Sequence, residues 1–355
     1  MRLPRVRTLT SALLALPLAL PLALLTPTAG AAADGTGSLS LAAATTVGIH
    51  NTYDQGAYTY LAQALDSGSS LIELDTWFNV FTHHWNVSHA NPLGDSNNCV
   101  QAKAPADLYT GSRSQDLDSC LDDLRVWLTA HPDHPPVMVK LEMKAGFDQT
   151  IGMGPAALDG YIAQHLGSLV YKPADLLRKP DGSSYPDLDT AAKAGNWPTR
   201  DALAGKVIIE AIPGTVEEAN PFDHLWTDTE YAQYLRGLAA AGTIGNAEIF
   251  PSVLGAQAGD PRTRYPDATL RPWFVVFDGD AATYLSSSDT AWYDRSHYLV
   301  VTTDAQNVAP AIDDTNPTVD QARARVAQLA AAHASFVSSD WRTLTTVLPE
   351  VLPRG

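Results

Sequence analysis

The feature that most constrains the fold is a series of eight short apolar runs that alternate with helical patterns along the chain. Several of these runs are apolar at consecutive positions, as parallel strands buried on both faces should be. We expect strands over residues 45–50, 71–77, 137–143, 206–212, 247–253, 273–278, 298–303 and 335–339.

Helical patterns lie between most of the predicted strands. We expect helices over 60–67, 119–130, 155–166, 229–241 and 319–332, with a turn over 201–204. Prolines and glycines mark the boundaries, as they do at helix starts and stops. Eight strands alternating with helices predict an α/β protein with a single domain, a distorted (β/α)8 TIM barrel. An open doubly wound sheet is the alternative, but no glycine-rich phosphate loop follows the first strand.

The first 31 residues have the pattern of a secretory signal peptide. Three arginines precede an apolar run over 12–25, and a small-residue site suited to cleavage ends at Ala31. The apolar run is interrupted by Pro17 and Pro21 and is too short for a membrane span. We therefore expect a secreted, extracellular protein whose catalytic barrel comprises residues 32–355.

The charge of the chain limits its partners. The whole sequence has a net charge of −16, and removal of residues 1–31 takes away three arginines and no acid, which leaves −19. Such a charge argues against nucleic acid and against electrostatic adsorption to anionic membranes. We expect a monomer. The two cysteines, Cys99 and Cys120, are expected to form one disulfide in an exported protein.

Polar residues collect where the predicted strands end. His50 and Asn51 end the first strand, Glu73 and Asp75 the second, and Glu142 the third. Active sites of (β/α)8 barrels lie at the C-terminal ends of the strands, so these side chains should meet on one rim. Further acids follow the later strands, namely Glu210, Asp278, Asp304 and Asp340.

The residue types at this rim suit calcium-assisted chemistry on a phosphate. Calcium binds six to eight oxygen ligands, and Asn51, Glu73, Asp75 and Glu142 offer an amide and three carboxylates. Two histidines, His50 and His89, could stabilise a charged phosphorane and protonate a leaving alcohol. Taken singly, each residue is equally well explained as a solvated strand end or a structural histidine. His83, His84 and His89 could instead form a transition-metal site.

Two further segments have two interpretations each. Lys144 alternates with Glu142 along the third strand, so it could hold a substrate phosphate or form an internal ion pair with Glu142 or Asp75. The aromatic segment 77–81, followed by Trp85, could insert into a lipid interface or form a hairpin buried against the barrel.

Four motifs give the chain a resemblance to a known family. Gly48-Ile49-His50-Asn51-Thr52-Tyr53, Leu71-Ile72-Glu73-Leu74-Asp75-Thr76-Trp77, Val87-Ser88-His89 and Val139-Lys140-Leu141-Glu142 resemble motifs of the calcium-dependent phosphoinositide-specific phospholipases C. The secreted bacterial branch is the most similar. The likeness continues through 91–94, 212–215 and 271–274, and so covers most of the mature chain.

The resemblance implies an enzyme, a phosphoric diester hydrolase that cleaves phosphatidylinositol between phosphate and diacylglycerol. Attack by the inositol 2-hydroxyl then gives a cyclic inositol phosphate. By carry-over, Asn51, Glu73, Asp75 and Glu142 hold Ca²⁺, His50 stabilises the transition state, and His89 is the general acid. Glu73 or Glu142 takes the attacking proton. We assign substrate binding to Lys144, Asp278 and Asp304, and expect transient contact with a membrane surface.

Several alternatives stay open beside this reading. A glycerophosphodiester phosphodiesterase usually follows its first histidine with Arg-Gly, whereas Asn51-Thr52 follows His50 here. A metal-independent phospholipase C uses an arginine where calcium would bind, and no arginine occurs between Arg7 and Arg113. A non-catalytic inositol-phosphate-binding barrel would bind without turnover. A glycosidase would use two strand-end carboxylates and no calcium.

Overall fold

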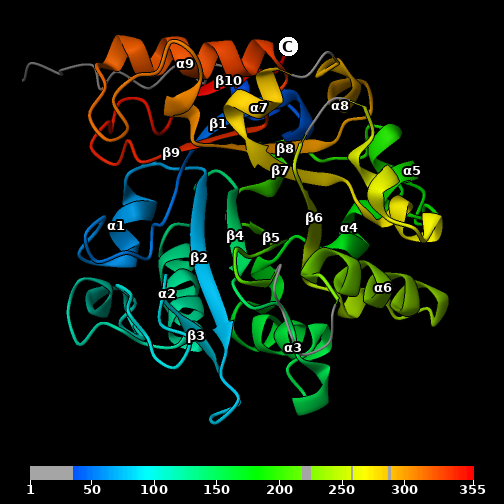
Figure 1. Ribbon diagram of the computed structural model, residues 1–355, viewed down its shortest axis with the longest axis horizontal. Coiled ribbons are helices and arrows are strands. Elements are labelled where there is room, and N and C mark those ends of the chain that lie inside the picture. The colour runs from blue at the N-terminus through cyan, green and yellow to red at the C-terminus, as the bar shows by residue number, and fades with distance from the viewer. Residues whose placement is uncertain (1–34, 218–224, 257–258, 287–288) are drawn as a thin grey trace, which may run out of the picture. The chain divides into compact units, whose positions relative to one another are not determined.

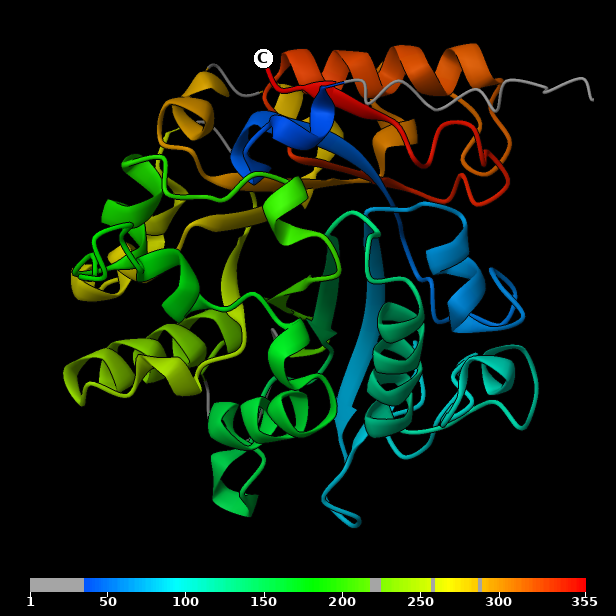
Figure 2. The same ribbon diagram turned by 180° about the vertical axis from the view of Figure 1, so that it is seen from behind.

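A computed structural model describes residues 35–217, 225–256, 259–286 and 289–355. The predicted signal peptide lies outside these residues. Within residues 35–355 one sheet closes into a barrel, and helices pack on its outside (Figures 1 and 2). None of the helices in the described ranges has the length and apolar character needed to cross a membrane.

All eight predicted strands are present, and they run parallel around the barrel. Their bounds differ from the prediction by at most three residues, and the strand at 137–143 has the predicted ends. They are β1 (Ala44–Ile49), β2 (Leu71–Phe78), β4 (Val137–Met143), β5 (Val207–Pro213), β6 (Phe250–Leu254), β7 (Val276–Asp280), β8 (Leu299–Thr303) and β9 (Phe336–Ser339). The distorted (β/α)8 barrel is therefore confirmed.

Two short strands extend the sheet in the antiparallel sense. β3 (Trp85–Val87) pairs with β2, and β10 (Val351–Pro353) pairs with β1. Neither was predicted, because three residues are too few to show a periodicity in sequence. The β2–β3 hairpin projects beyond the end of β2 (Figure 1).

The helices differ from the prediction mainly where they are short. The five predicted helices correspond to α1 (Leu61–Asp66), α2 (Leu117–Ala130), α3 (Pro155–His165), α6 (Thr227–Ala240) and α9 (Val319–Ala331). Four helices of five or six residues were not expected, namely α4 (Pro173–Leu177), α5 (Leu188–Lys193), α7 (Ala281–Leu285) and α8 (Ala291–Arg295). Such short helices have too few turns to display an apolar face.

The barrel closes between β1 and β2 through a single pair of residues, Gly48 and Leu71. A Cβ on Gly48 would lie 2.7 Å from the Leu71 Cβ, which is closer than two carbons can approach. Glycine at this position therefore lets the first and second strands meet.

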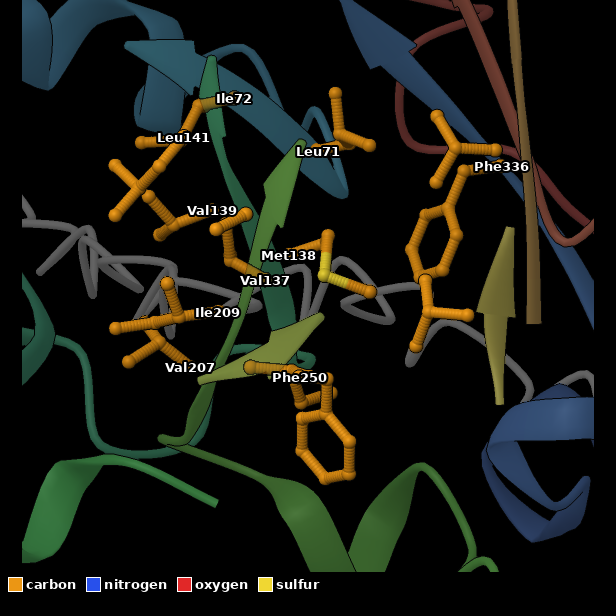
Figure 3. Packing of buried hydrophobic residues seen from close by; sticks show 14 of the residues in the cluster. Leu71, Ile72, Val137, Met138, Val139, Leu141, Val207, Ile209, Phe250 and Phe336 are labelled. Carbon is orange, nitrogen blue, oxygen red and sulfur yellow. The ribbon is translucent and has the colours of Figure 1, made fainter. Parts of the chain in front are cut away.

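The register of β2 against β4 decides which side chains face the barrel interior. It pairs Leu71 with Met138, Glu73 with Lys140, and Asp75 with Glu142. Figure 3 shows Ile72, Val139 and Leu141 on one side of these strands, and Leu71 and Met138 on the other. Because successive side chains alternate, the apolar set faces the helices, and the acids continue the interior face toward the C-terminal rim.

The strand β6 begins three residues later than predicted for a local reason. The backbone N–H of Glu248 donates to Asp159 Oδ1 at 3.2 Å, and that of Ile249 donates to the Tyr231 hydroxyl at 3.1 Å. Side chains of α3 and α6 thus take the hydrogen bonds that a neighbouring strand would otherwise supply.

Candidate active site

Three carboxylates meet at the C-terminal ends of β2 and β4. One oxygen of each of Glu73, Asp75 and Glu142 lies within 4.8 Å of the others. Glu73 and Asp75 are 1% and 0% exposed. The parallel register places Asp75 beside Glu142, so the two predicted acidic motifs form one cluster.

Asn51 follows β1 and adds an amide oxygen to this region. Its φ of 51° is in the left-handed region, which asparagine tolerates better than most residues. Its backbone N–H donates to Glu73 Oε2 at 3.1 Å. Its buried side-chain Oδ1 has no hydrogen-bond partner within the described ranges. A buried amide oxygen without a donor suits a cation ligand.

Two buried lysines neutralise part of the acidic charge. Lys144 Nζ is 3.2 Å from Asp75 Oδ2 and 2.9 Å from Glu142 Oε1. Lys140 Nζ is 3.2 Å from Glu73 Oε1 and 3.0 Å from Asp278 Oδ2. The internal ion pair that the sequence left open for Lys144 is therefore present.

The barrel interior still carries an excess of negative charge. The two lysines face five carboxyl groups, those of Glu73, Asp75, Glu142, Glu210 and Asp278. Burial, then the charges of Glu73 and Glu142, raises the pKa of Asp75 to about 7. Burial and the charge of Asp278 raise the pKa of Glu210 well above its usual value. A divalent cation would relieve this repulsion, so the residues present fit Ca²⁺.

His50 is held at the same rim by an acid from the opposite end of the sequence. Its Nδ1 is 3.3 Å from Asp340 Oδ1, and its Nε2 is 4.0 Å from Glu73 Oε2. Burial lowers the pKa of His50, but the hydrogen bond with Asp340 and the charge of Glu73 outweigh it and raise the pKa to about 9. Asp340 follows β9 directly, so its place at a strand end was the signal that could have identified it.

His89 lies just beyond β3 and is exposed. The backbone before it is fixed, because the Ser88 N–H donates to the Asp75 carbonyl at 3.1 Å and the Ser88 carbonyl accepts from Trp77 Nε1 at 2.7 Å. Among the described residues no hydrogen bond or ion pair involves the His89 side chain. The hairpin thus brings His89 close along the chain to Asp75 while leaving its ring in solvent.

A hollow of about 270 Å³ opens beside the acidic cluster. Its lining brings together residues from most strands, namely His50, Glu73, Lys140, Glu142, Ile212, Pro213, Gly214, Thr215, Leu254, Asp278, Thr303 and Asp304. Lys144, Asn51, Asp75 and His89 are not part of this lining. A larger hollow of about 340 Å³ beside Trp226 and Arg264 contains none of the candidate catalytic residues.

The loop after β5 contributes a contact that sequence reasoning did not assign. The Thr215 N–H donates to Glu142 Oε1 at 3.2 Å, and the Gly214 N–H donates to the Met143 carbonyl at 3.0 Å. A Cβ on Gly214 would lie 2.4 Å from Lys144 Cα, so only glycine allows this close approach. The motif 212–215 was noted in the sequence, but a contact across strands cannot be derived from it.

The aromatic segment after β2 combines both interpretations drawn from sequence. Trp77, Phe78 and Trp85 are 7%, 6% and 1% exposed, whereas Val80 and Phe81 at the hairpin tip are 36% and 78% exposed. The base of the hairpin therefore packs against the barrel, and its tip presents apolar side chains to solvent.

The predicted disulfide is present between Cys99 and Cys120. It joins the loop after β3 to the first turn of α2. Asp123 on the same helix accepts hydrogen bonds from the Val100 and Ala102 backbone N–H groups at 2.7 and 2.6 Å. The long segment between β3 and α2 is thus fastened at several points.

Comparison with known proteins places this site in a family. The family model described as "Phosphoinositide phospholipase C, Ca2+-dependent" matches residues 105–217. A Ca²⁺-dependent phosphatidylinositol-specific phospholipase C from Streptomyces antibioticus is 55% identical, with a TM-score of 0.85 over 89% of this chain and 99% of that chain. No match is found among curated proteins.

More distant structures share the fold. A calcium-dependent phosphoinositol-specific phospholipase C from a Gram-negative Pseudomonas sp. is 19% identical, with a TM-score of 0.67 over 90% of this chain and 96% of that chain. At that identity the likeness concerns the barrel alone. The 55% identity over nearly the whole described chain is decisive, and this protein belongs to the Ca²⁺-dependent phosphoinositide-specific phospholipase C family of phosphodiesterases.

Proposed function

We propose that this protein cleaves phosphatidylinositol between phosphate and diacylglycerol and releases a cyclic inositol phosphate. The observation that carries the proposal is the oxygen-ligand cluster of Glu73, Asp75 and Glu142 beside a histidine, His50, that is paired with Asp340. The adjoining hollow of about 270 Å³ lies near the lower end of the range for small-molecule sites, roughly 300–1,000 Å³, which suits a single polar headgroup.

In this proposal Asn51, Glu73, Asp75 and Glu142 hold the calcium ion. When bound, Ca²⁺ supplies positive charge that binds the phosphate and lowers the pKa of the attacking hydroxyl. Glu73 or Glu142 accepts the proton of the inositol 2-hydroxyl as its oxygen attacks phosphorus. Both carboxylates line the hollow, so this proton transfer is within reach of either.

The two histidines act on the phosphate in different roles. His50, with its pKa raised to about 9, carries a proton that it can donate to the phosphoryl oxygens as negative charge develops. His89 donates a proton to the diacylglycerol oxygen as the bond from phosphorus to that oxygen breaks. Its exposed position suits a group that meets the lipid part of the substrate at the mouth of the site.

The substrate-binding roles rest on charge and position. Asp278 and Asp304 line the hollow and offer carboxylates to inositol hydroxyls. Lys144 is buried against Asp75 and Glu142, so it supports the phosphate through the acidic cluster rather than from the open hollow.

The proposal places the enzyme outside the cell as a monomer that touches membranes transiently. The exposed Val80 and Phe81 at the hairpin tip offer apolar contact, which a net charge of −16 does not provide electrostatically. The signal-peptide pattern over residues 1–31 supports secretion, and extracellular calcium suits the acidic cluster.

Phosphorus NMR of the products from phosphatidylinositol tests the function directly. We expect a cyclic phosphate signal that requires Ca²⁺ and disappears in EGTA. His50→Ala and His89→Ala should each lower the rate by on the order of 10²-fold or more, with unchanged circular dichroism. Near-wild-type rates in either variant would overturn that histidine's role.

The same assay separates the alternatives. Cleavage of glycerophosphoinositol in preference to the lipid would indicate a glycerophosphodiester phosphodiesterase. Tight binding of inositol phosphate without turnover would indicate a binding protein. Activity that survives EGTA would remove the calcium mechanism altogether.

A further inference from the structure

A second group of metal-binding side chains lies outside the barrel, where the β2–β3 hairpin meets the start of α2. β3 packs beside α2 (Figure 1). His84 Nδ1 is 3.7 Å from Asp116 Oδ2 and 3.9 Å from Asp118 Oδ2. One ligand atom from each of these three residues lies within 4.8 Å of the other two. None of them belongs to the Glu73 cluster.

The distances suit a shared cation better than direct hydrogen bonds. Ligand atoms bound to a tetrahedral Zn²⁺ at about 2.0–2.1 Å are about 3.4 Å apart, so the two distances from His84 Nδ1 are within roughly half an ångström of that spacing. Both exceed an ordinary hydrogen bond. A single Nδ1–H can also serve only one of the two carboxylates, whereas one ion between them serves all three groups.

The carboxylates repel each other in the arrangement without an ion. Burial, then the charge of Asp116, raises the pKa of Asp118, although His165 and His84 act against this. The pKa of Asp95 is also raised, mainly by burial and further by the charge of Asp116. A cation placed among these groups would relieve that repulsion.

The ligand atoms are already held in position by other contacts. Asp116 caps α2, with Oδ1 accepting from the Ser119 N–H at 3.2 Å and the Ser119 hydroxyl at 2.8 Å, which leaves Oδ2 facing His84. The His84 ring packs edge-on against Tyr161 at 6.3 Å, and the His84 carbonyl accepts from the Asn79 N–H at 2.9 Å. A site fixed in this way binds a metal without reorganisation.

A second histidine supports Asp118 from the far side. His165, the last residue of α3, has Nε2 3.8 Å from Asp118 Oδ1 and Nδ1 3.0 Å from Asp122 Oδ1. Asp122 is in turn paired with Arg125 at 3.1 Å. The ring therefore orients Asp118, in the way that outer partners orient metal ligands.

We propose that His84, Asp116 and Asp118 bind a divalent transition-metal cation of the Zn²⁺ type, with His165 as a positioning residue. The imidazole nitrogen distinguishes this site from the oxygen-only calcium cluster. The partial exposure of the three ligands leaves the remaining coordination positions to water. The bound ion joins the base of the hairpin to α2 and so stiffens the segment between the exposed tip and His89. The proposal does not depend on the proposed function.

Zinc binding by the purified, untagged mature protein tests the proposal. In excess Ca²⁺, titration against a chromogenic zinc chelator should give one tight Zn²⁺ per chain. His84→Ala and Asp118→Asn should each remove this equivalent, and His165→Ala should weaken it about 10–100-fold. His83→Ala is the matched control, because the His83 Nδ1 lies 3.1 Å from the Ile151 carbonyl and takes no part in the cluster.

Hydrogen exchange supplies a second readout that does not involve activity. Zn²⁺ should slow exchange of the backbone amides over residues 79–88 in the wild type and in His83→Ala, but not in His84→Ala. Thermal melts without zinc should be the same for all variants, which checks that each is folded. The proposal is overturned if the wild type binds no Zn²⁺, or if His84→Ala and Asp118→Asn keep the wild-type equivalent.

Discussion

Glu142 occupies a different position from the other two acids of the calcium cluster. It is only partly buried, and Oε1 accepts from both the Lys144 ammonium at 2.9 Å and the Thr215 N–H at 3.2 Å. It lines the hollow as well, so it faces both the proposed metal and the substrate.

Replacing Glu142 with Gln should raise the calcium concentration needed for half-maximal activity. The amide keeps an oxygen ligand but removes a negative charge, so we expect a shift of roughly tenfold or more, about 1.4 kcal/mol per factor of ten. Calcium titration of the initial rate measures this shift. Asp304→Asn is the control, because it should raise KM without moving the calcium titration. An unmoved calcium curve in Glu142→Gln would remove it from the ligand set.

Gly214→Ala should reduce activity more than stability. The added Cβ would meet Lys144 Cα at 2.4 Å and the Met143 carbonyl at 2.5 Å, so the loop must move and Thr215 loses its contact with Glu142. We expect a rate at least several-fold lower. Gly237→Ala in α6 is the matched control, since its Cβ meets nothing within 4 Å. Equal rates for the two variants would contradict this account of the loop.

At the scale of elements, α2 organises one side of the barrel. Asp116 fixes its start, and the disulfide at Cys120 ties its first turn to the loop that follows β3. Removing the disulfide should therefore loosen this loop before it affects the strands.

Replacing both Cys99 and Cys120 with Ser should lower the free energy of unfolding by about 3 kcal/mol, because the closed loop is roughly 20 residues long. Urea denaturation measures the change. Reduced wild-type protein should match the double variant, and a reduced protein as stable as the oxidised one would show that the loop is held by its hydrogen bonds alone.

The contact between α3 and the start of β6 contains a buried acid whose ionisation opposes folding. Burial raises the pKa of Asp159 from 3.8 to about 7. The unfolded chain loses this proton near pH 4, whereas the folded protein keeps it until near pH 7. The contribution of Asp159 to stability therefore falls as the pH rises from about 4 to 7.

Asp159→Asn should remove this dependence. Its Oδ1 can still accept from the Tyr231 hydroxyl and the Glu248 N–H. The free energy of unfolding of the variant, relative to the wild type, should increase between pH 5 and pH 8 by on the order of a few kcal/mol. Urea denaturation at both values tests this, and a constant difference would show that Asp159 does not titrate in this range.

At the scale of the whole molecule, the barrel holds more carboxylates than cations at one rim. The five interior carboxyl groups converge from β2, β4, β5 and β7 and face only Lys140 and Lys144. Folding concentrates this charge, and the unfolded chain disperses it. Stability should therefore depend on calcium as well as activity does.

Calcium should raise the melting temperature of the full chain, by an amount that grows with its free concentration. Mg²⁺ should have a smaller effect, because it keeps its water and requires a tighter geometry. Differential scanning calorimetry with Ca²⁺, Mg²⁺ and EGTA measures this. Asp75→Asn should largely remove the calcium effect, and a full calcium shift in that variant would place the ion elsewhere.

The sequence by itself determined the elements and the kind of site. Strand-length apolar runs separated by helical patterns specify a barrel, because each run must be buried on both faces. Strand-end positions then identified His50, Glu73, Asp75 and Glu142. The short helices, β3 and β10 were beyond it, because three to six residues carry no period.

Only the tertiary structure decided which groups meet. The pairing of His50 with Asp340 joins residues 290 positions apart, and Lys140 bridges Glu73 and Asp278 through strands that are distant in sequence. Likewise, His84 lies beside Asp116 and Asp118 rather than beside His83 or His89. Residue types and spacing set which chemistry is available, but register and barrel closure set the distances, and ligand geometry depends on distances of a few ångströms.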